Sequence, residues 1–247
     1  MINMHQKRIS IPKSWKVPKK TYKWITSTNP GPHNKLLALP LIILIRDLLH
    51  LCNTLNEGKK ILQSNNILIN GTIRKNTKFP VGLFDVLSIK NEKKNFKLLQ
   101  NKKGQLYLKE INEDESKWKL CKIINITSIN KETKQLNLND GTNILVNNNE
   151  IYNTKDTIKI SLPEKKILNK YEYHVGSLII IIGGSHNGEI GTIKKIIKIN
   201  SSKNNIVLVS SMNKDQLEFE TIEKYIFVIS EEEKNKLKND IEMKVNE

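Results

Sequence analysis

The side chains able to do metal or nucleophilic chemistry are few in this sequence of 247 residues, and they lie far apart. None of the five histidines stands four residues from another, as the two zinc ligands of a metallohydrolase helix do. Cys52 and Cys121 have no partner at metal-ligand spacing, and the apolar surroundings of Cys121 indicate a core strand rather than an activated thiol. The sequence therefore predicts no metal, no cofactor, no small-molecule substrate and no catalytic residue, with both thiols reduced.

One glycine-rich segment and one acid are the remaining candidates for chemistry. The glycines at 184, 188 and 191 have neither the spacing of a dinucleotide fingerprint nor a Gly-Lys-Ser/Thr ending, and residues 190–199 look like strand rather than helix. Nucleotide binding is therefore disfavoured. Asp85 follows an apolar residue, where an acid more often makes a hydrogen bond at a turn or strand start than it serves an RNA-modifying enzyme. We predict a structural aspartate.

Basic and aromatic side chains interleave in the first 35 residues. Trp15, Tyr22 and Trp24 alternate with lysines, a mixture suited to contacting phosphates while stacking on exposed bases. Four prolines and the lack of an apolar period indicate an extension that adds nothing to a core, so the following module should fold without it. The alternative is a solvated tail, but three large aromatics are unusual in a disordered segment. We expect this extension to become ordered against RNA.

The charge distribution also favours nucleic acid as the partner. The formal net charge of +16 divides into +8 for residues 1–39, +8 for 40–103, +2 for 104–170 and −2 for 171–247. Heavy use of Lys, Asn and Ile is a bias that AT-rich coding can produce, but such coding would not exclude Asp and Glu from 39 consecutive residues. A positive surplus gathered in one part of the chain can concentrate on a polyanion.

Two helices are predicted after the extension. Apolar residues recur at three- and four-residue intervals from 41 to 52, which predicts a helix that begins at Pro40 and buries one face. Thr54 and Glu57 have the spacing of a capping box, which predicts a second, short and basic helix through about Ser64.

A hairpin is predicted next. Asn70-Gly71 favours the positive φ values of a tight turn, here between strands at 67–69 and 72–74. With a closing strand over 84–89, the segment from 40 to 89 resembles the small helix-helix-hairpin RNA-binding module first described in ribosomal proteins. The resemblance implies that this segment binds structured RNA.

Resemblance to one family extends over almost the whole chain. The motifs that carry it, in order, are Lys7-Arg8, Pro12-Lys13-Ser14-Trp15, Gly31-Pro32-His33, Leu39-Pro40-Leu41-Ile42, Lys78-Phe79-Pro80-Val81-Gly82 and Lys119-Leu120-Cys121-Lys122. Together they resemble the archaeal and eukaryotic family of small-subunit ribosomal protein four of the e type. The resemblance implies a structural constituent of the cytoplasmic ribosome, with small-subunit rRNA and neighbouring small-subunit proteins as partners.

The second half of the chain is predicted to be β-rich. Residues 104–162 read as short strands, starting with Leu106 and Leu108 and including a hairpin near Asp140. Farther on, the spacing Gly184-x-x-x-Gly188-x-x-Gly191 resembles the KOW motif, a β-loop-β element of a small barrel. Residues 185–187 are less basic than this loop is in many KOW proteins, so binding another protein or closing the barrel stay open beside RNA binding.

The predicted fold class is therefore α+β multidomain. Its parts are a basic extension (1–39), a small α/β helix-helix-hairpin module (40–103), a central β-rich domain (104–170), an SH3-like β-barrel of KOW type (171–229) and a charged tail (230–247). The predicted RNA-binding residues are Lys7, Arg8, Lys13, Trp15, Lys19, Lys20, Lys23, Trp24, Arg46, Lys59, Lys60, Arg74, Lys75 and Lys78, of which Lys59, Lys60, Arg74 and Lys75 should form one patch. The predicted loop glycines are Gly71, Gly184, Gly188 and Gly191.

Two other functions stay open at this point. An RNA-modifying enzyme can carry the same module, but residues 104–247 show neither a dinucleotide-type glycine loop nor a cluster of acids suited to catalysis. A free transcription or translation factor could use the KOW-like barrel. A membrane partner is not expected, because the longest apolar run, at 36–45, is interrupted by Pro40 and is far shorter than the roughly 20 residues of a membrane span.

Overall fold

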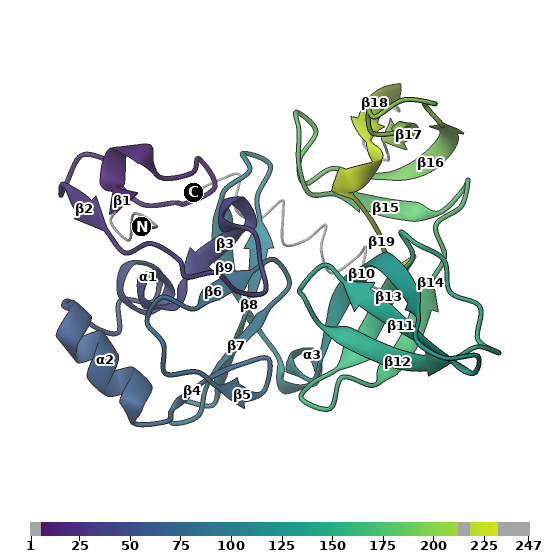
Figure 1. Ribbon diagram of the computed structural model, residues 1–247. Coiled ribbons are helices and arrows are strands. Elements are labelled where there is room, and N and C mark those ends of the chain that lie inside the picture. The colour runs from purple at the N-terminus through teal and green to yellow at the C-terminus, as the bar shows by residue number, and fades with distance from the viewer. Residues whose placement is uncertain (1–5, 212–217, 232–247) are drawn as a thin grey trace.

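The computed structural model describes residues 6–211 and 218–231, so most of the predicted tail lies outside the described residues. The chain is mostly β with few helices, in a multidomain α+β layout of three five-stranded sheets and two strand pairs (Figure 1). Every pair of neighbouring strands in these sheets is antiparallel. Short 3₁₀ turns cover Arg8–Ser10, Lys35–Leu37 and Glu223–Tyr225.

The N-terminal unit is built on the sheet with strand order β5-β4-β7-β8-β9. Its strands are β4 (Ile67–Ile69), β5 (Thr72–Ile73), β7 (Val86–Ile89), β8 (Lys94–Gln100) and β9 (Leu106–Ile111). A separate pair joins β3 (Ala38–Pro40) to β6 (Pro80–Gly82). Because β9 pairs with β8, the predicted boundary at residue 103 falls inside a hairpin. Leu106 and Leu108 thus belong to the first sheet, and their assignment to the central domain was wrong.

The first helix is shorter and more deeply buried than its periodicity predicted. It consists of α1 (Leu41–Ile43) and a π-helical turn over Leu44–Leu48. Residues 41 to 45 are all fully buried, so the prediction of a single buried face was wrong. The run Leu-Ile-Ile-Leu-Ile is apolar on every side, and a helix of that kind is stable only inside a core.

The second helix and the hairpin follow the predictions closely. Helix α2 (Leu55–Gln63) begins after Thr54, whose hydroxyl accepts from the Glu57 N–H at 3.3 Å while the Glu57 carboxylate accepts from the Thr54 N–H. The capping box is therefore confirmed. Between β4 and β5, Asn70 and Gly71 have φ values of 51° and 76°, which suit a two-residue hairpin turn.

The N-terminal extension is a folded part of this unit. Strands β1 (Gln6–Lys7) and β2 (Trp24–Ile25) pair with each other. Ile11, Trp15, Val17 and Ile25 are buried in the same core as the first helix and the five-stranded sheet, and the Leu106 N–H donates to the Ser14 carbonyl at 2.7 Å. The prediction of an extension without core residues was wrong.

The central unit is a sheet with strand order β12-β11-β10-β13-β14. Its strands are β10 (Trp118–Ser128), β11 (Thr133–Leu138), β12 (Asn143–Asn147), β13 (Thr157–Ser161) and β14 (Ile167–Tyr171), preceded by the short helix α3 (Glu113–Ser116). The predicted hairpin near Asp140 joins β11 to β12. Cys121 is buried in the core of this sheet, and both cysteines are free thiols, as the sequence predicted.

The C-terminal unit is a sheet with strand order β18-β17-β16-β15-β19. Its strands are β15 (Leu178–Ile181), β16 (Ile190–Ile197), β17 (Ile206–Ser211), β18 (Glu218–Ile222) and β19 (Ile226–Val228). The last strand returns to pair with β15, and the inward-facing Ile and Val side chains form a core of their own.

Two buried lysines of β10 connect the central sheet to the other two units, which lie on either side of it in Figure 1. The Lys119 ammonium lies 3.3 Å from the Asp85 carboxylate and also contacts Asp140. The Lys122 ammonium donates to the carbonyls of Glu223 at 2.9 Å and Ile226 at 2.8 Å. Burial lowers the pKa of Lys122 to about 8, although the nearby Glu223 acts in the opposite direction.

Candidate RNA interface

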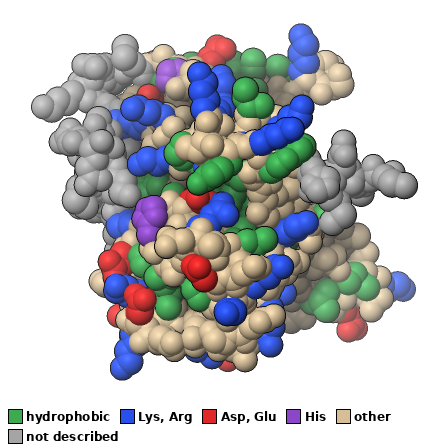
Figure 2. Space-filling model, turned by 90° about the vertical axis from the view of Figure 1, so that its left-hand side faces the viewer, with side chains coloured by type: hydrophobic (Ala, Val, Ile, Leu, Met, Phe, Trp, Pro, Cys, Tyr) green, Lys and Arg blue, Asp and Glu red, His purple; other side chains and the backbone are tan. Residues whose placement is uncertain are grey.

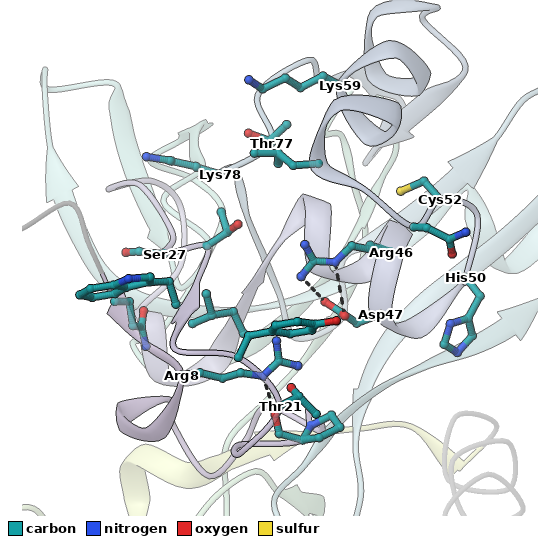
Figure 3. Close-up of a pocket in the computed structure, with 18 of the residues that line it drawn as sticks. Arg8, Thr21, Ser27, Arg46, Asp47, His50, Cys52, Lys59, Thr77 and Lys78 are labelled. Atoms are coloured by element: carbon teal, nitrogen blue, oxygen red, sulfur yellow. Dashed lines mark hydrogen bonds and ion pairs between the residues drawn. The ribbon is translucent and has the colours of Figure 1, made fainter.

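An open groove of about 1040 Å³ separates the folded extension from the first turn of α2 and the segment before β6 (Figure 3). Its lining is mainly polar and basic. Five of the predicted RNA-binding residues line it: Arg8, Trp24, Arg46, Lys59 and Lys78. The lining also includes Lys16 and Tyr22, which the predicted set omitted although they belong to the same interleaved stretch of lysines and aromatics.

Two of the three extension aromatics are exposed at this groove. Tyr22 is 75% exposed and Trp24 is 51% exposed, so both rings are open to a stacking partner. The Lys23 ammonium lies 5.4 Å from the centre of the Trp24 ring. Trp15 is only 2% exposed and packs in the core, so its prediction as an RNA-stacking residue was wrong. Spacing among lysines did not distinguish this ring from the other two.

The arginines of the groove are held by the protein itself. Arg8 is only 5% exposed, and its Nε donates to the Pro18 carbonyl at 2.5 Å. Its guanidinium lies 5.7 Å from the centre of the Tyr22 ring, so it fixes the turn that presents Tyr22. Arg46 forms an ion pair with the adjacent Asp47 at 2.8 Å, and this pair orients the guanidinium at the groove.

The other predicted cations are exposed but do not line the groove. They are Lys7, Lys13, Lys19, Lys20, Lys23, Lys60, Arg74 and Lys75. Of the predicted patch, Lys59 lines the groove and the other three do not, while the Arg74 guanidinium lies 4.8 Å from the Phe79 ring centre. On the face shown in Figure 2, Lys and Arg side chains surround a hollow and outnumber the acids. The patch itself stays a prediction.

The glycine-rich loop between β15 and β16 contacts the N-terminal unit. Gly184 and Gly188 have φ values of 82° and 75°. Asn187 is buried, and its side-chain amide donates to the Asn101 carbonyl at 3.1 Å in the β8–β9 turn. The loop therefore makes a protein contact within its own chain. Gly191 has an ordinary φ, but a Cβ there would lie 2.5 Å from the Ser210 carbonyl oxygen.

Replacing Gly188 with valine should destabilise the C-terminal unit by at least about 1 to 2 kcal/mol, because a β-branched residue is strained at this positive φ. Its Cβ would also lie 3.4 Å from the Lys102 backbone. Limited proteolysis should then cut after about residue 170 sooner than in the wild type. Gly176→Val is the matched control, since Gly176 has a φ of 93° and open space around it. A Gly188→Val protein as resistant as the wild type would contradict the expectation.

A search for other kinds of site is confined to residues 6–211 and 218–231. In that part of the chain, His, Cys, Asp and Glu side chains do not gather in groups of three or more that could hold a metal ion. Nor does it contain a helix with the length and apolar character needed to cross a membrane.

Sequence reasoning missed one cluster, which is buried and has four elements as its source. The Asp85 carboxylate accepts from His33 Nε2 at 2.7 Å, from Asn70 Nδ2 at 2.7 Å and from the Gly82 N–H at 2.9 Å. Lys119 joins it to Asp140. The turn hydrogen bond predicted for Asp85 is confirmed, and the cluster as a whole is structural because Asp85, Lys119 and Asp140 are at most 5% exposed.

Comparisons with known proteins agree over nearly the full chain. The model of ribosomal family S4e matches residues 92–167, and the RS4NT (NUC023) domain matches residues 2–36. Small ribosomal subunit protein eS4 of Archaeoglobus fulgidus is 43% identical over 236 residues, covering 96% of this chain and 97% of the relative. The protein of the same name from Methanothermobacter thermautotrophicus is 40% identical over 230 residues, covering 93% of each chain.

A solved structure gives the same answer for the fold. The crystal structure of the 30S ribosomal protein S4e from Thermoplasma acidophilum matches with a TM-score of 0.65 and 27% identity, covering 78% of this chain and 95% of that one. Identity of 43% over almost the whole length of a relative is far more than a shared module would produce. The chain therefore belongs to the ribosomal S4e family.

Proposed function

We propose that the chain is a structural constituent of the small ribosomal subunit and binds rRNA through its N-terminal unit. The observation that carries this is its full-length similarity to proteins named small ribosomal subunit protein eS4. The family is one of ribosomal structural proteins, so the chain is not an enzyme. The surplus of positive charge in the first 103 residues supports RNA as the ligand of this unit.

The first helix, α2 and the β4–β5 hairpin are proposed to form the helix-helix-hairpin RNA-binding module. Their order along the chain, the capping box and the Asn70-Gly71 turn support that assignment. The groove adds a concave, basic surface where α2 meets the folded extension. We propose that the extension is part of the RNA interface as well as part of the core, because Tyr22 and Trp24 are exposed at this groove.

The C-terminal sheet is proposed to be a barrel of KOW type, and the domain division follows the sheets. Support comes from the loop glycines between β15 and β16 and from the return of β19 to β15. Because the loop contacts the Asn101 turn, we propose that it anchors this unit to the N-terminal one rather than binding RNA directly. Outward surfaces of the central and C-terminal sheets are then left for neighbouring small-subunit proteins, with the first boundary moved to about residue 111.

Reversing the charge of both Lys60 and Arg74 should weaken binding to small-subunit rRNA. Each lost phosphate contact removes released counterions, so the slope of log affinity against log salt should fall by about 0.7 to 0.9 per contact. Both side chains are exposed, so the melting temperature should stay nearly unchanged. Filter binding at several KCl concentrations gives the affinity and the slope together.

The matched control is reversal of Lys198 and Lys203, two exposed lysines of the C-terminal unit that change the net charge equally. If the control weakens binding as much as the Lys60 and Arg74 variant does, total charge rather than this surface decides affinity. Equal loss of folding in the Lys60 and Arg74 variant would show that these side chains are structural.

A further inference from the structure

The side-chain amide of Gln6 is without partners at the groove. Gln6 lines the groove and is only 5% exposed, and neither its amide nitrogen nor its amide oxygen has a hydrogen-bond partner among the described residues. Leaving buried polar atoms unpaired is costly, and folded proteins satisfy nearly all of them. This amide therefore indicates a ligand that completes its hydrogen bonds.

The amide also selects among the ligands that a basic groove attracts. An amide offers two N–H donors and one carbonyl acceptor. A phosphate supplies acceptors only, so it would leave the Gln6 carbonyl oxygen without a donor. The edge of a nucleobase carries donors and acceptors side by side, and a glutamine can pair with both at once. A base edge is thus a better complement to Gln6 than the RNA backbone is.

Tyr22 and Trp24 indicate the form of the RNA. Both rings line the same groove and more than half of each is exposed. Aromatic rings stack on bases that have left a helix, and sequence-specific contacts to RNA are made mostly to unpaired bases because the major groove of an RNA duplex is too narrow to read. Lys59 and Lys78 line the groove and can contact the phosphates of such a strand.

Resting on the proposed rRNA-binding function, we infer that the groove holds an unpaired segment of RNA. Gln6 hydrogen-bonds to the edge of one base after its side chain turns toward the groove, and Tyr22 and Trp24 stack on bases. Lys59 and Lys78 contact the backbone. The groove therefore reads sequence at one nucleotide, whereas the exposed lysines elsewhere on the unit bind any RNA.

Fluorescence anisotropy on the full chain tests this inference with labelled ten-nucleotide strands of A, U or C and a ten-base-pair RNA duplex. We expect one homopolymer to bind at least about 5-fold more tightly than the others, as a paired amide discriminates between bases. Gln6→Leu and Gln6→Glu should each remove this preference. Tyr22→Ala and Trp24→Ala should weaken binding of all three strands by about 5-fold or more and leave duplex binding nearly unchanged.

Leu36→Ala is the control, because Leu36 is 62% exposed and lies outside the groove lining. Melting curves of all variants identify any that fold poorly. Equal binding of strands and duplex, with the aromatic variants behaving as the control does, would overturn the inference while small-subunit rRNA binding stands. A base preference that survives both Gln6 variants would overturn the role of Gln6. Failure to bind any RNA, rRNA included, would overturn the proposed function as well.

Discussion

Replacing Trp15 with alanine is expected to lower the free energy of unfolding of the N-terminal unit by about 3 to 5 kcal/mol, the usual range for truncating a buried tryptophan. Trp15 is 2% exposed and packs in the core that the extension shares with the first helix and β9. The cavity left behind cannot collapse easily, because the Leu106 N–H holds the adjacent backbone at Ser14. Urea unfolding followed by tryptophan fluorescence and circular dichroism measures the loss.

Trp24→Ala is the matched control, since this ring is 51% exposed and its removal should change stability by less than about 0.5 kcal/mol. The two variants reverse roles in RNA binding, where Trp24→Ala should be the weaker. Deleting residues 1–35 should destabilise the unit at least as much as Trp15→Ala does. A stable deletion variant would show that the extension covers the core without contributing to it.

The sequence predicted local features of the fold well, because their causes are local. The capping box of α2 depends on Thr54 and Glu57, three residues apart, and the hairpin depends on the φ preferences of Asn70 and Gly71. The first helix shows the limit of such reasoning. Its apolar intervals fit an amphipathic helix, yet burial on every side depends on what packs around it.

Features that depend on distant segments could not be predicted. The sequence around Trp15 resembles that around Trp24, and only the approach of Leu106, some 90 residues later, buries the first ring. The same strand, β9, falls beyond the charge-based boundary at 103 because net charge carries no information on strand pairing. Gln6 gave no signal either, since an amide becomes informative only when its burial and its missing partners are known.

The cluster around Asp85 is the largest charged contact between the units and the least visible in the sequence. Its members come from positions 33, 70, 85, 119 and 140. Burial alone would raise the pKa of Asp85, but the charges of His33 and Lys119 and the hydrogen bonds from His33 and Asn70 outweigh burial, so the pKa lies well below its ordinary value. Burial would lower the pKa of Lys119, but Asp85 and Asp140 raise it above its ordinary value.

Replacing Asp85 with asparagine is therefore expected to lower the free energy of unfolding by about 3 to 5 kcal/mol at pH 7, because a buried ammonium would lose one of its two carboxylates. Asp114→Asn is the control, since the Asp114 side chain is 93% exposed and its ion pair with Lys117 contributes little. Urea unfolding of both variants gives the comparison. A loss of less than 1 kcal/mol at Asp85 would contradict the assignment of this cluster as a joint between units.

The pH dependence of the same difference identifies its cause. A carboxylate whose pKa is lower in the folded state stabilises the fold fully above its unfolded pKa of roughly 4, and this stabilisation is lost as the pH falls toward the folded pKa. The gap in unfolding free energy between wild type and Asp85→Asn should therefore be constant from about pH 7 to 5 and shrink below about pH 4. Acids that both proteins share cancel in the difference. A gap that stays constant down to pH 3 would mean that packing of the side chain, rather than its charge beside His33 and Lys119, holds the N-terminal and central units together.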